Sequence, residues 1–300
     1  MGSEMCIRDR FLFFVLSAYL LDRQIAVVLL AGKGSMRYWL YYFLRRFLRI
    51  YPLFIVSLLI FYYINGPIKT VEDVYNHLLL LEGKSVFWSI SVEFKYYFLS
   101  PFLLLFCHKV LKWDPKKLFV FFLLLLMASI YYGQTQGVPK LSIIKYLPIF
   151  LMGTVFSIYE LLKIKYFEGK DYSKIVEVLG WGGVGLIIIS GSYYFELIFG
   201  YSRNFFGAKW FLPFGLAMLA MLISAKHGYG LMRKILEFKP LRFLGTISYS
   251  LYLLHLPVMY MTRRLPLPMP FEERIFYFSG LVLLVSCISY LLIELSLIHI

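Results

Sequence analysis

The sequence predicts an all-α fold, a polytopic bundle of transmembrane helices, and three observations support this prediction. Hydrophobic residues make up 60% of the 300 residues and charged residues only 16%, whereas soluble domains carry about 25% charged residues. The mean hydropathy is +0.73. Apolar runs recur along the chain at close to the roughly 20 residues that a helix needs to cross a bilayer.

About nine apolar runs are long enough to be spanning helices. They cover residues 11–31, 47–64, 87–108, 117–133, 142–161, 176–199, 208–225, 243–262 and 274–294. Short connections join them, which favours a single membrane domain over residues 11–294. The two ends, residues 1–10 and 295–300, resemble adapter-derived sequence and are interpreted as non-native.

Basic residues alternate between the connections. The first, third, fifth and seventh connections carry roughly twice as many Lys and Arg residues as the others, and basic loops stay in the cytoplasm. The pattern therefore predicts that the visible N-terminus lies outside and the C-terminus in the cytoplasm. The expected location is a bacterial inner membrane. The net charge of +14 is assigned to these loops, so membrane lipids are expected as partners and nucleic acid is not.

Metal chemistry is not expected from this sequence. The chain has only three cysteines, Cys6, Cys107 and Cys287. Two of them lie within apolar runs, and neither a disulfide framework nor the spacing of a metal site is indicated.

The first and second spans carry charges that need an explanation. Asp22 and Arg23 are adjacent in the first apolar run, and we interpret them as a mutually compensated pair. Arg46 and Arg49 lie three residues apart, on one face of a helix entering the membrane from the cytoplasm. Two guanidiniums side by side suit a phosphate or pyrophosphate. Orienting charge with lipid-headgroup contact is the alternative, and it remains open.

The third span carries an acid inside an apolar run. A charge in hydrocarbon costs roughly 2.5–3.5 kcal/mol on insertion scales, so such residues usually face a bundle interior or a wet cavity. Glu93 is predicted about 9 Å below the outer end of the helix, with Trp88 at the outer interface. Glu93 is either a structural acid paired with Lys95 or an arginine, or a proton acceptor. The polar stripe on its face comprises Ser89, Glu93, Tyr96 or Tyr97, and Ser100.

Later spans add a second polar stripe and a packing signal. Ser248, Tyr252 and His255 fall at i, i+4 and i+7, so they share one face of a helix. His255 is either a satisfied structural residue or a catalytic one. Glu294 is expected to pair with an arginine at the cytoplasmic face. The glycine-rich stretch at residues 180–183 predicts close helix packing.

Several blocks together resemble the acyltransferase-3 family of integral-membrane O-acyltransferases. The blocks are FFVLSAYL, RRFLRIYPL, FWSISVEFKYYFLSPFLL, FLGTISYSLYLLHLPV and SYLLIE, in that order. The resemblance implies ten or more spans and transfer of an acyl group, most often acetyl, from cytoplasmic acyl-CoA to a hydroxyl. It also implies that Arg46 and Arg49 hold the CoA donor.

The same resemblance assigns the remaining site residues. It implies that Glu93 and His255 are catalytic, and Trp88, Ser91 and Tyr252 are expected to bind substrate. In the family the principal catalytic His lies in a helix upstream of the FFVLSGF block, which begins here directly after residue 10. The resemblance therefore implies that this helix is missing and that the chain as written is inactive. The usual Gly is Ala18, and the residue after Glu93 is Phe94 rather than Glu or Gln.

The predicted function is a membrane O-acyltransferase with acyl-CoA, most simply acetyl-CoA, as donor and no metal. The acceptor is a hydroxyl of a carbohydrate or lipid-linked saccharide. The alternative is a transporter or flippase of a lipid-linked or anionic solute, which shares the intramembrane charges but usually shows inverted repeats. Oligomeric state does not follow from the sequence.

Overall fold

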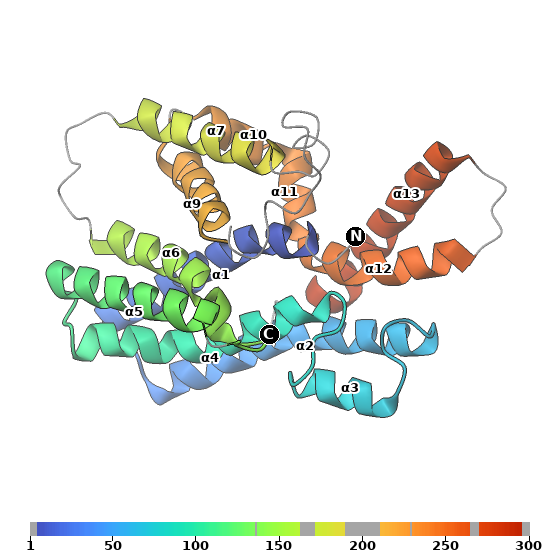
Figure 1. The fold of residues 1–300 in the computed structure, drawn as a ribbon, viewed down its shortest axis with the longest axis horizontal. Coiled ribbons are helices and arrows are strands. Elements are labelled where there is room, and N and C mark those ends of the chain that lie inside the picture. The colour runs from blue at the N-terminus through green and yellow to red at the C-terminus, as the bar shows by residue number, and fades with distance from the viewer. Residues whose placement is uncertain are drawn as a thin grey trace. The chain divides into compact units, whose positions relative to one another are not determined.

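The computed structural model describes residues 5–135, 137–162, 172–189, 211–228, 230–264 and 270–295. Every regular element in these ranges is a helix (Figure 1), which confirms the predicted all-α fold there. The helices are α1 (Met5–Leu30), α2 (Met36–Tyr63), α3 (Val71–Leu78), α4 (Phe87–Lys109), α5 (Pro115–Thr135), α6 (Ile143–Leu162), α7 (Ser173–Ile189), α9 (Phe211–His227), α10 (Leu231–Leu236), α11 (Lys239–Thr246), α12 (Ser248–Arg264), α13 (Phe271–Ser289) and the π-helical η3 (Tyr290–Glu294).

Five helices in the described ranges are long and apolar enough to cross a membrane, and a shorter one covers Leu212–His227. The five are Arg10–Leu30, Phe87–Lys109, Pro115–Gly133, Ile143–Leu162 and Glu273–Glu294. They confirm a helical membrane protein and match the first, third, fourth, fifth and ninth predicted spans. A total of nine spans stays a prediction. The predicted spans 47–64 and 243–262 are not among the five, and residues 190–210, which include parts of the predicted spans 176–199 and 208–225, lie outside the described residues.

The predicted span 243–262 differs from the observed helices. The chain turns at Ile247, between α11 and α12 (Figure 1), so this range is not one straight helix. Thr246 Oγ1 donates to Arg242 O at 2.9 Å, and Ser248 Oγ donates to Gly245 O at 2.7 Å. Serine and threonine hydroxyls that bond nearby carbonyls in this way compete with regular helix geometry.

The chain forms two compact units. Unit 1 comprises residues 1–34 and 92–238, and unit 2 comprises residues 35–91 and 239–300. The boundary falls within α4, after Ser91. The predicted single domain over residues 11–294 stays a prediction, and the units are described separately below.

Unit 1 is built on close contact between α1 and α6, with α5 also on α6 and with α9 against α1, α6 and α7. A Cβ on Gly153 of α6 would lie 2.2 Å from Val15 O of α1, so only glycine allows this approach. The Phe150 ring stacks on Phe14 at 4.6 Å and on Tyr96 of α4 at 4.1 Å between centroids. These contacts make α4 and α6 the buried centre of the unit.

Glycines also bring α7 against α9. A Cβ on Gly180 would lie 2.3 Å from Ser224 Cβ, and one on Gly183 would lie 2.7 Å from Ala217 O. The predicted close packing at residues 180–183 is therefore confirmed. In Figure 1, α7 runs beside α9 and α10.

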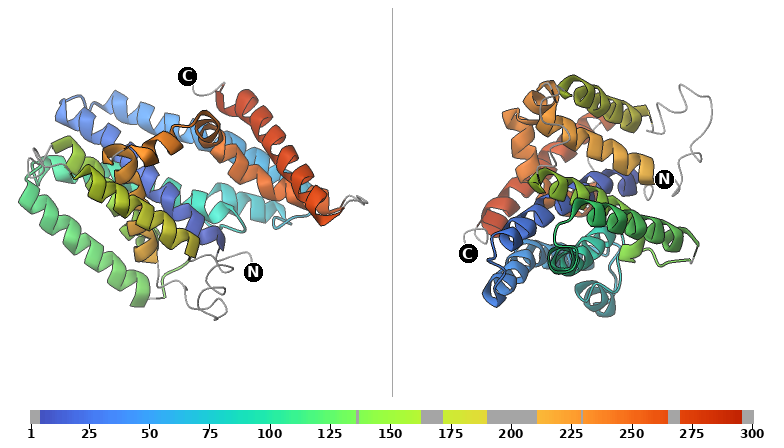
Figure 2. Two further views of the ribbon diagram at one scale, coloured as in Figure 1. Left: turned by 90° about the horizontal axis from the view of Figure 1, so that it is seen from above. Right: turned by 90° about the vertical axis from the view of Figure 1, so that its left-hand side faces the viewer.

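In unit 2, α2 packs against α3 and α12, and α12 lies beside α13 (Figure 2). Contacts between α2 and α12 advance together along both helices, from Ile50 with Tyr249, through Ser57 with Leu253, to Phe61 with Tyr260. The two helices are therefore parallel. The alternating loop charges require the same of the second and eighth spans.

Candidate active site

Two tyrosines of α12 join sequence blocks that lie far apart in the chain. Tyr249 Oη donates to Ile50 O at 2.7 Å, directly after Arg49. Tyr252 Oη donates to Val86 O at 2.5 Å and lies 2.9 Å from Ser89 Oγ. Because these tyrosines are three residues apart, one helical turn of α12 holds both the arginine block and the Trp-Ser block.

His255 lies one further turn along α12. Its Nδ1 is 2.7 Å from Tyr252 O, and its ring centroid is 5.9 Å from that of Tyr252. A carbonyl oxygen can only accept a hydrogen bond, so Nδ1 must be the donor. The neutral ring therefore carries its proton on Nδ1 and a lone pair on Nε2. That tautomer is the one in which Nε2 can act as a base.

The two predicted donor arginines differ in their surroundings. The Arg46 guanidinium lies 6.0 Å above the Tyr42 ring and is half-buried, whereas Arg49 is exposed. Arg49 also interacts electrostatically with Glu294, in line with the expected pairing of this acid with an arginine, and Ser250 Oγ donates to the Glu294 carboxylate. The motif on α12 is thus linked to the C-terminal block as well.

The first turn of α4 packs against α2. The Phe87 ring packs edge-on against Phe54 at 5.4 Å and against Phe61 at 5.5 Å. Tyr51 Oη donates to Leu78 O at 3.1 Å, so the connection after α2 folds back along that helix. The expected place of Trp88 at the outer membrane interface stays a prediction.

The serines of the Trp-Ser block are buried and bonded to backbone. Ser91 Oγ donates to Phe87 O at 3.3 Å and to Glu82 O at 3.4 Å, and Ser89 Oγ donates to Val86 O at 3.2 Å. These bonds fix the first turn of α4 and the loop before it. Substrate contact by Ser91 stays a prediction.

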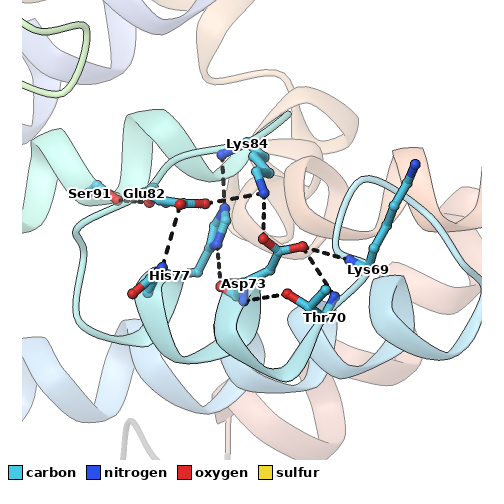
Figure 3. A network of polar contacts seen from close by, with 8 residues as sticks. Lys69, Thr70, Asp73, His77, Glu82, Lys84 and Ser91 are labelled. Carbon is cyan, nitrogen blue, oxygen red and sulfur yellow. Dashed lines mark hydrogen bonds and ion pairs between the residues drawn. The ribbon is translucent and has the colours of Figure 1, made fainter.

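The short helix α3 was not predicted, although its sequence carried a signal. Thr70 Oγ1 accepts from Asp73 N at 3.0 Å, and Asp73 Oδ2 accepts from Thr70 N at 3.2 Å. This capping box has a recognisable pattern, a Thr followed three residues later by an acid. Lys84 Nζ bonds Asp73 Oδ1 at 2.5 Å and closes the loop onto α3 (Figure 3).

His77 at the centre of this network must be neutral. Its Nδ1 lies 2.6 Å from Asp73 O, while its Nε2 accepts from Lys84 N at 2.9 Å. A proton on Nε2 would remove the second bond. Burial lowers the pKa of His77, and a hydrogen bond from Lys84 holds the pKa of the Asp73 carboxyl well below its usual range.

Glu93 belongs to unit 1 and is held by hydroxyls. Its Oε1 accepts from Ser17 Oγ at 2.6 Å and from Tyr97 Oη at 2.5 Å. The open alternative of a Glu93–Lys95 pair is wrong, because Lys95 Nζ instead donates to Leu141 O at 3.0 Å. Ser17 lies in the FFVLSAYL block, so this bond links that block to the acid.

The predicted Asp22–Arg23 pair is also wrong. Asp22 is fully buried and accepts from Tyr96 Oη at 2.5 Å and from Ser100 Oγ. Arg23 instead contacts Glu160, with Nε 3.5 Å from Oε2. Consecutive residues on a helix point about 100° apart, so the two side chains reach different neighbours.

A polar cluster around Glu160 was missed by sequence reasoning. Tyr19 Oη donates to Glu160 Oε2 at 2.5 Å, and Lys226 Nζ bonds both the carboxylate and Tyr19 Oη. His227 Nε2 lies 3.6 Å from Glu160 Oε1. A lone acid at the end of the fifth predicted span was the available signal, but its partners come from α1 and α9.

The predicted site residues are therefore only partly brought together. Those in unit 2 are Arg46, Arg49, Trp88, Ser91, Tyr252 and His255, whereas Glu93 belongs to unit 1. In unit 2 hydrogen bonds tie their three sequence blocks to one another. The catalytic, donor-binding and substrate-binding roles stay predictions.

Comparison with known proteins gives one match. A family model described as an acyltransferase domain, Acyl_transf_3, matches residues 12–294, nearly the whole chain. No curated protein and no solved structure matches the chain.

Proposed function

Because the chain belongs to the acyltransferase-3 family, we propose that it moves an acyl group, acetyl in the simplest case, from acyl-CoA to a hydroxyl of a carbohydrate or glycolipid. Membership makes it a membrane acyltransferase in general terms, and its apolar spanning helices agree with that. The donor, the acceptor and the bacterial inner membrane as location belong to the proposal.

The single observation that carries the proposal is the double attachment of α12. Tyr249 bonds the backbone beside Arg49, and Tyr252, one turn away, bonds the loop and helix that begin the Trp-Ser block. His255 follows one turn later with its Nδ1 on Tyr252 O. A donor-binding block, an acceptor-binding block and a base would thus share one helix as scaffold.

Arg46 and Arg49 would bind the donor. They lie on one face of α2; Arg46 is half-buried and Arg49 is exposed. Guanidinium groups bind phosphate oxygens bidentately and remain charged at any working pH. The pyrophosphate and phosphate of acyl-CoA are substrate groups of this kind.

The acyl transfer needs a base and donors for a developing oxyanion. The base takes the proton of the acceptor hydroxyl as its oxygen bonds to the thioester carbon. The tetrahedral intermediate then expels the CoA sulfur, which receives that proton, leaving an ester and free CoA. His255 Nε2 is the base that we assign within the described residues of unit 2, and the catalytic role expected of Glu93 in unit 1 stays a prediction. Trp88 and Tyr252 would line the acceptor side.

The test measures CoA release and acyl incorporation in membranes supplied with radiolabelled acetyl-CoA. Arg46→Ala and Arg49→Ala should each raise the KM for acetyl-CoA about tenfold or more, since each removes a charge-assisted contact. Arg45→Ala is the matched control, because Arg45 is an exposed neighbour on the same helix. Unchanged donor kinetics in both variants would remove the donor site.

The base assignment is tested separately. His255→Ala should lower kcat by about a hundredfold or more if its imidazole takes the proton. Full activity of His255→Ala would assign the base to another residue.

A further inference from the structure

Unit 1 contains an apolar groove of about 1000 Å³ between α5, α6, α7 and α9. Its walls are almost entirely hydrocarbon, with Leu118, Phe122, Val155, Leu219 and Ile223 as representative lining residues. Along α6 the lining runs from Leu151 to Leu162, which corresponds to about 16 Å of helix. That length is close to one leaflet, half of the roughly 30 Å hydrocarbon core of a bilayer.

The polar side chains of the groove gather at one end. Tyr159, Tyr172, Ser173 and His227 line it, and they lie near the C-terminal ends of α6 and α9 and the N-terminal end of α7. The alternating loop charges place all of these helix ends at the cytoplasmic side. The groove therefore has an apolar body within the bilayer and a polar mouth at its inner surface.

Among the described residues, cations exceed anions in a cluster at this mouth. His227 lines the groove and also belongs to this cluster, in which Arg23, Lys226 and His227 surround the carboxylate of Glu160. The side chains of Arg23, Lys226 and His227 are 47%, 32% and 50% exposed, whereas that of Glu160 is 17% exposed. One acid thus faces two permanent cations and a histidine, which leaves accessible N–H donors and a positive charge.

We propose that this groove binds one anionic phospholipid of the cytoplasmic leaflet. The acyl chains lie against α5, α6, α7 and α9, and the phosphate is bound at Arg23, Lys226 and His227. Basic pockets between transmembrane helices on the cytoplasmic side are the usual binding sites for anionic headgroups. The acid Glu160 positions Lys226 and Arg23 rather than contacting the lipid.

The test is native mass spectrometry of the purified chain incubated with dioleoyl-phosphatidylglycerol or dioleoyl-phosphatidylcholine at equal concentration. One phosphatidylglycerol should remain bound. Its occupancy should exceed that of phosphatidylcholine about fivefold for each positive charge that Glu160 does not neutralise. Arg23→Gln should lower its occupancy about fivefold, and Val155→Trp should lower occupancy by filling the groove. Lys109→Gln, an exposed lysine at the end of α4, is the matched control and should change nothing.

Three results would overturn the proposal. They are equal retention of the two lipids, an Arg23→Gln variant that binds like the Lys109→Gln control, and displacement of the lipid by palmitoyl-CoA at equal concentration, which would assign the groove to a donor chain. Should Val155→Trp not fold, Arg23→Gln still decides, because it changes a half-exposed side chain. None of these readouts depends on acyl-transfer activity.

Discussion

Three acids of unit 1 and the linked blocks of unit 2 are satisfied by different kinds of partner. In unit 1, Asp22 and Glu93 accept from side-chain hydroxyls of other turns and helices, and Glu160 adds cations. In unit 2, Tyr249, Tyr252 and Ser57 donate mostly to backbone carbonyls. Unit 1 also contains backbone approaches that only glycine allows, as at Gly153.

The difference indicates how each unit responds to substitution. A buried carboxylate shared by several hydroxyls cannot be removed without leaving donors unsatisfied, and each such group costs about 1–3 kcal/mol. Removing a hydroxyl that donates to a backbone carbonyl loses one hydrogen bond, which lowers the free energy of unfolding by about 1 kcal/mol. Substitutions in unit 1 should therefore mainly lower the free energy of unfolding, whereas substitutions in unit 2 should mainly lower activity.

Asp22→Ala should have the largest effect. It leaves the hydroxyls of Tyr96 and Ser100 without their acceptor, so the free energy of unfolding should fall by roughly 3 kcal/mol or more. Denaturant unfolding in detergent micelles measures it. Asp22→Asn keeps an acceptor of the same shape and should lose less than half as much; equal losses would mean that the hydroxyls do not matter.

Gly153→Ala should come next. Its Cβ would lie 2.2 Å from Val15 O, a backbone atom that cannot rotate away, and overpacking of this kind costs about 1–3 kcal/mol. Gly182→Ala is the matched control, because nothing lies within 4 Å of its Cβ. Alanine there should stabilise α7 by up to about 1 kcal/mol. The same sign for both variants would contradict the close approach of α1 and α6.

Tyr252→Phe should separate stability from activity in unit 2. Loss of the bonds to Val86 O and Ser89 Oγ should lower the unfolding free energy by only about 1 kcal/mol. Acyl transfer should fall about tenfold, equivalent to about 1.4 kcal/mol in the barrier, because the turn that positions His255 loses its anchor. Tyr62→Phe, which removes a phenol hydroxyl from α2 instead, is the control. A stability loss without any loss of rate would refute the positioning role.

The α3 network should show the smallest effect, and it depends on pH. His77 has a lowered pKa in the folded state. Its contribution to folding stability is therefore complete above the pKa of the unfolded chain, near 6.5, and declines as the pH falls below that value. Amide exchange in residues 71–78, corrected for its intrinsic rate, should become roughly fivefold faster at pH 5.5 than at pH 7.5. Asp73 titrates lower and does not contribute in this window. A His77→Gln variant that keeps the pH response would assign it to another group.

Local sequence signals predicted much of this structure. The apolar runs predicted α1, α4, α5, α6 and α13, and the glycines at 180–183 predicted the close packing that α7 makes with α9. Two further features have a signal in the sequence but were not predicted. The capping box at Thr70 marks α3, and adjacency of Asp22 and Arg23 on a helix argues against their pairing.

Other features depend on partners that no local pattern contains. The Glu160 cluster draws Tyr19, Arg23, Lys226 and His227 from helices distant in sequence. The Tyr252–Ser89 contact joins positions 163 residues apart. In both cases the residue types were visible, but their meeting depends on how the helices pack.

By itself the sequence determined a helical membrane acyltransferase, because its apolar runs have the length at which a helix crosses a bilayer and the motif blocks follow the order of the family. Only the tertiary structure decided which polar groups satisfy one another inside it. A buried hydroxyl, carboxylate or imidazole must find a partner within about 3 Å, and that partner is chosen by helix packing rather than by sequence neighbours. The roles of Tyr249, Tyr252 and the Glu160 cluster follow from that requirement.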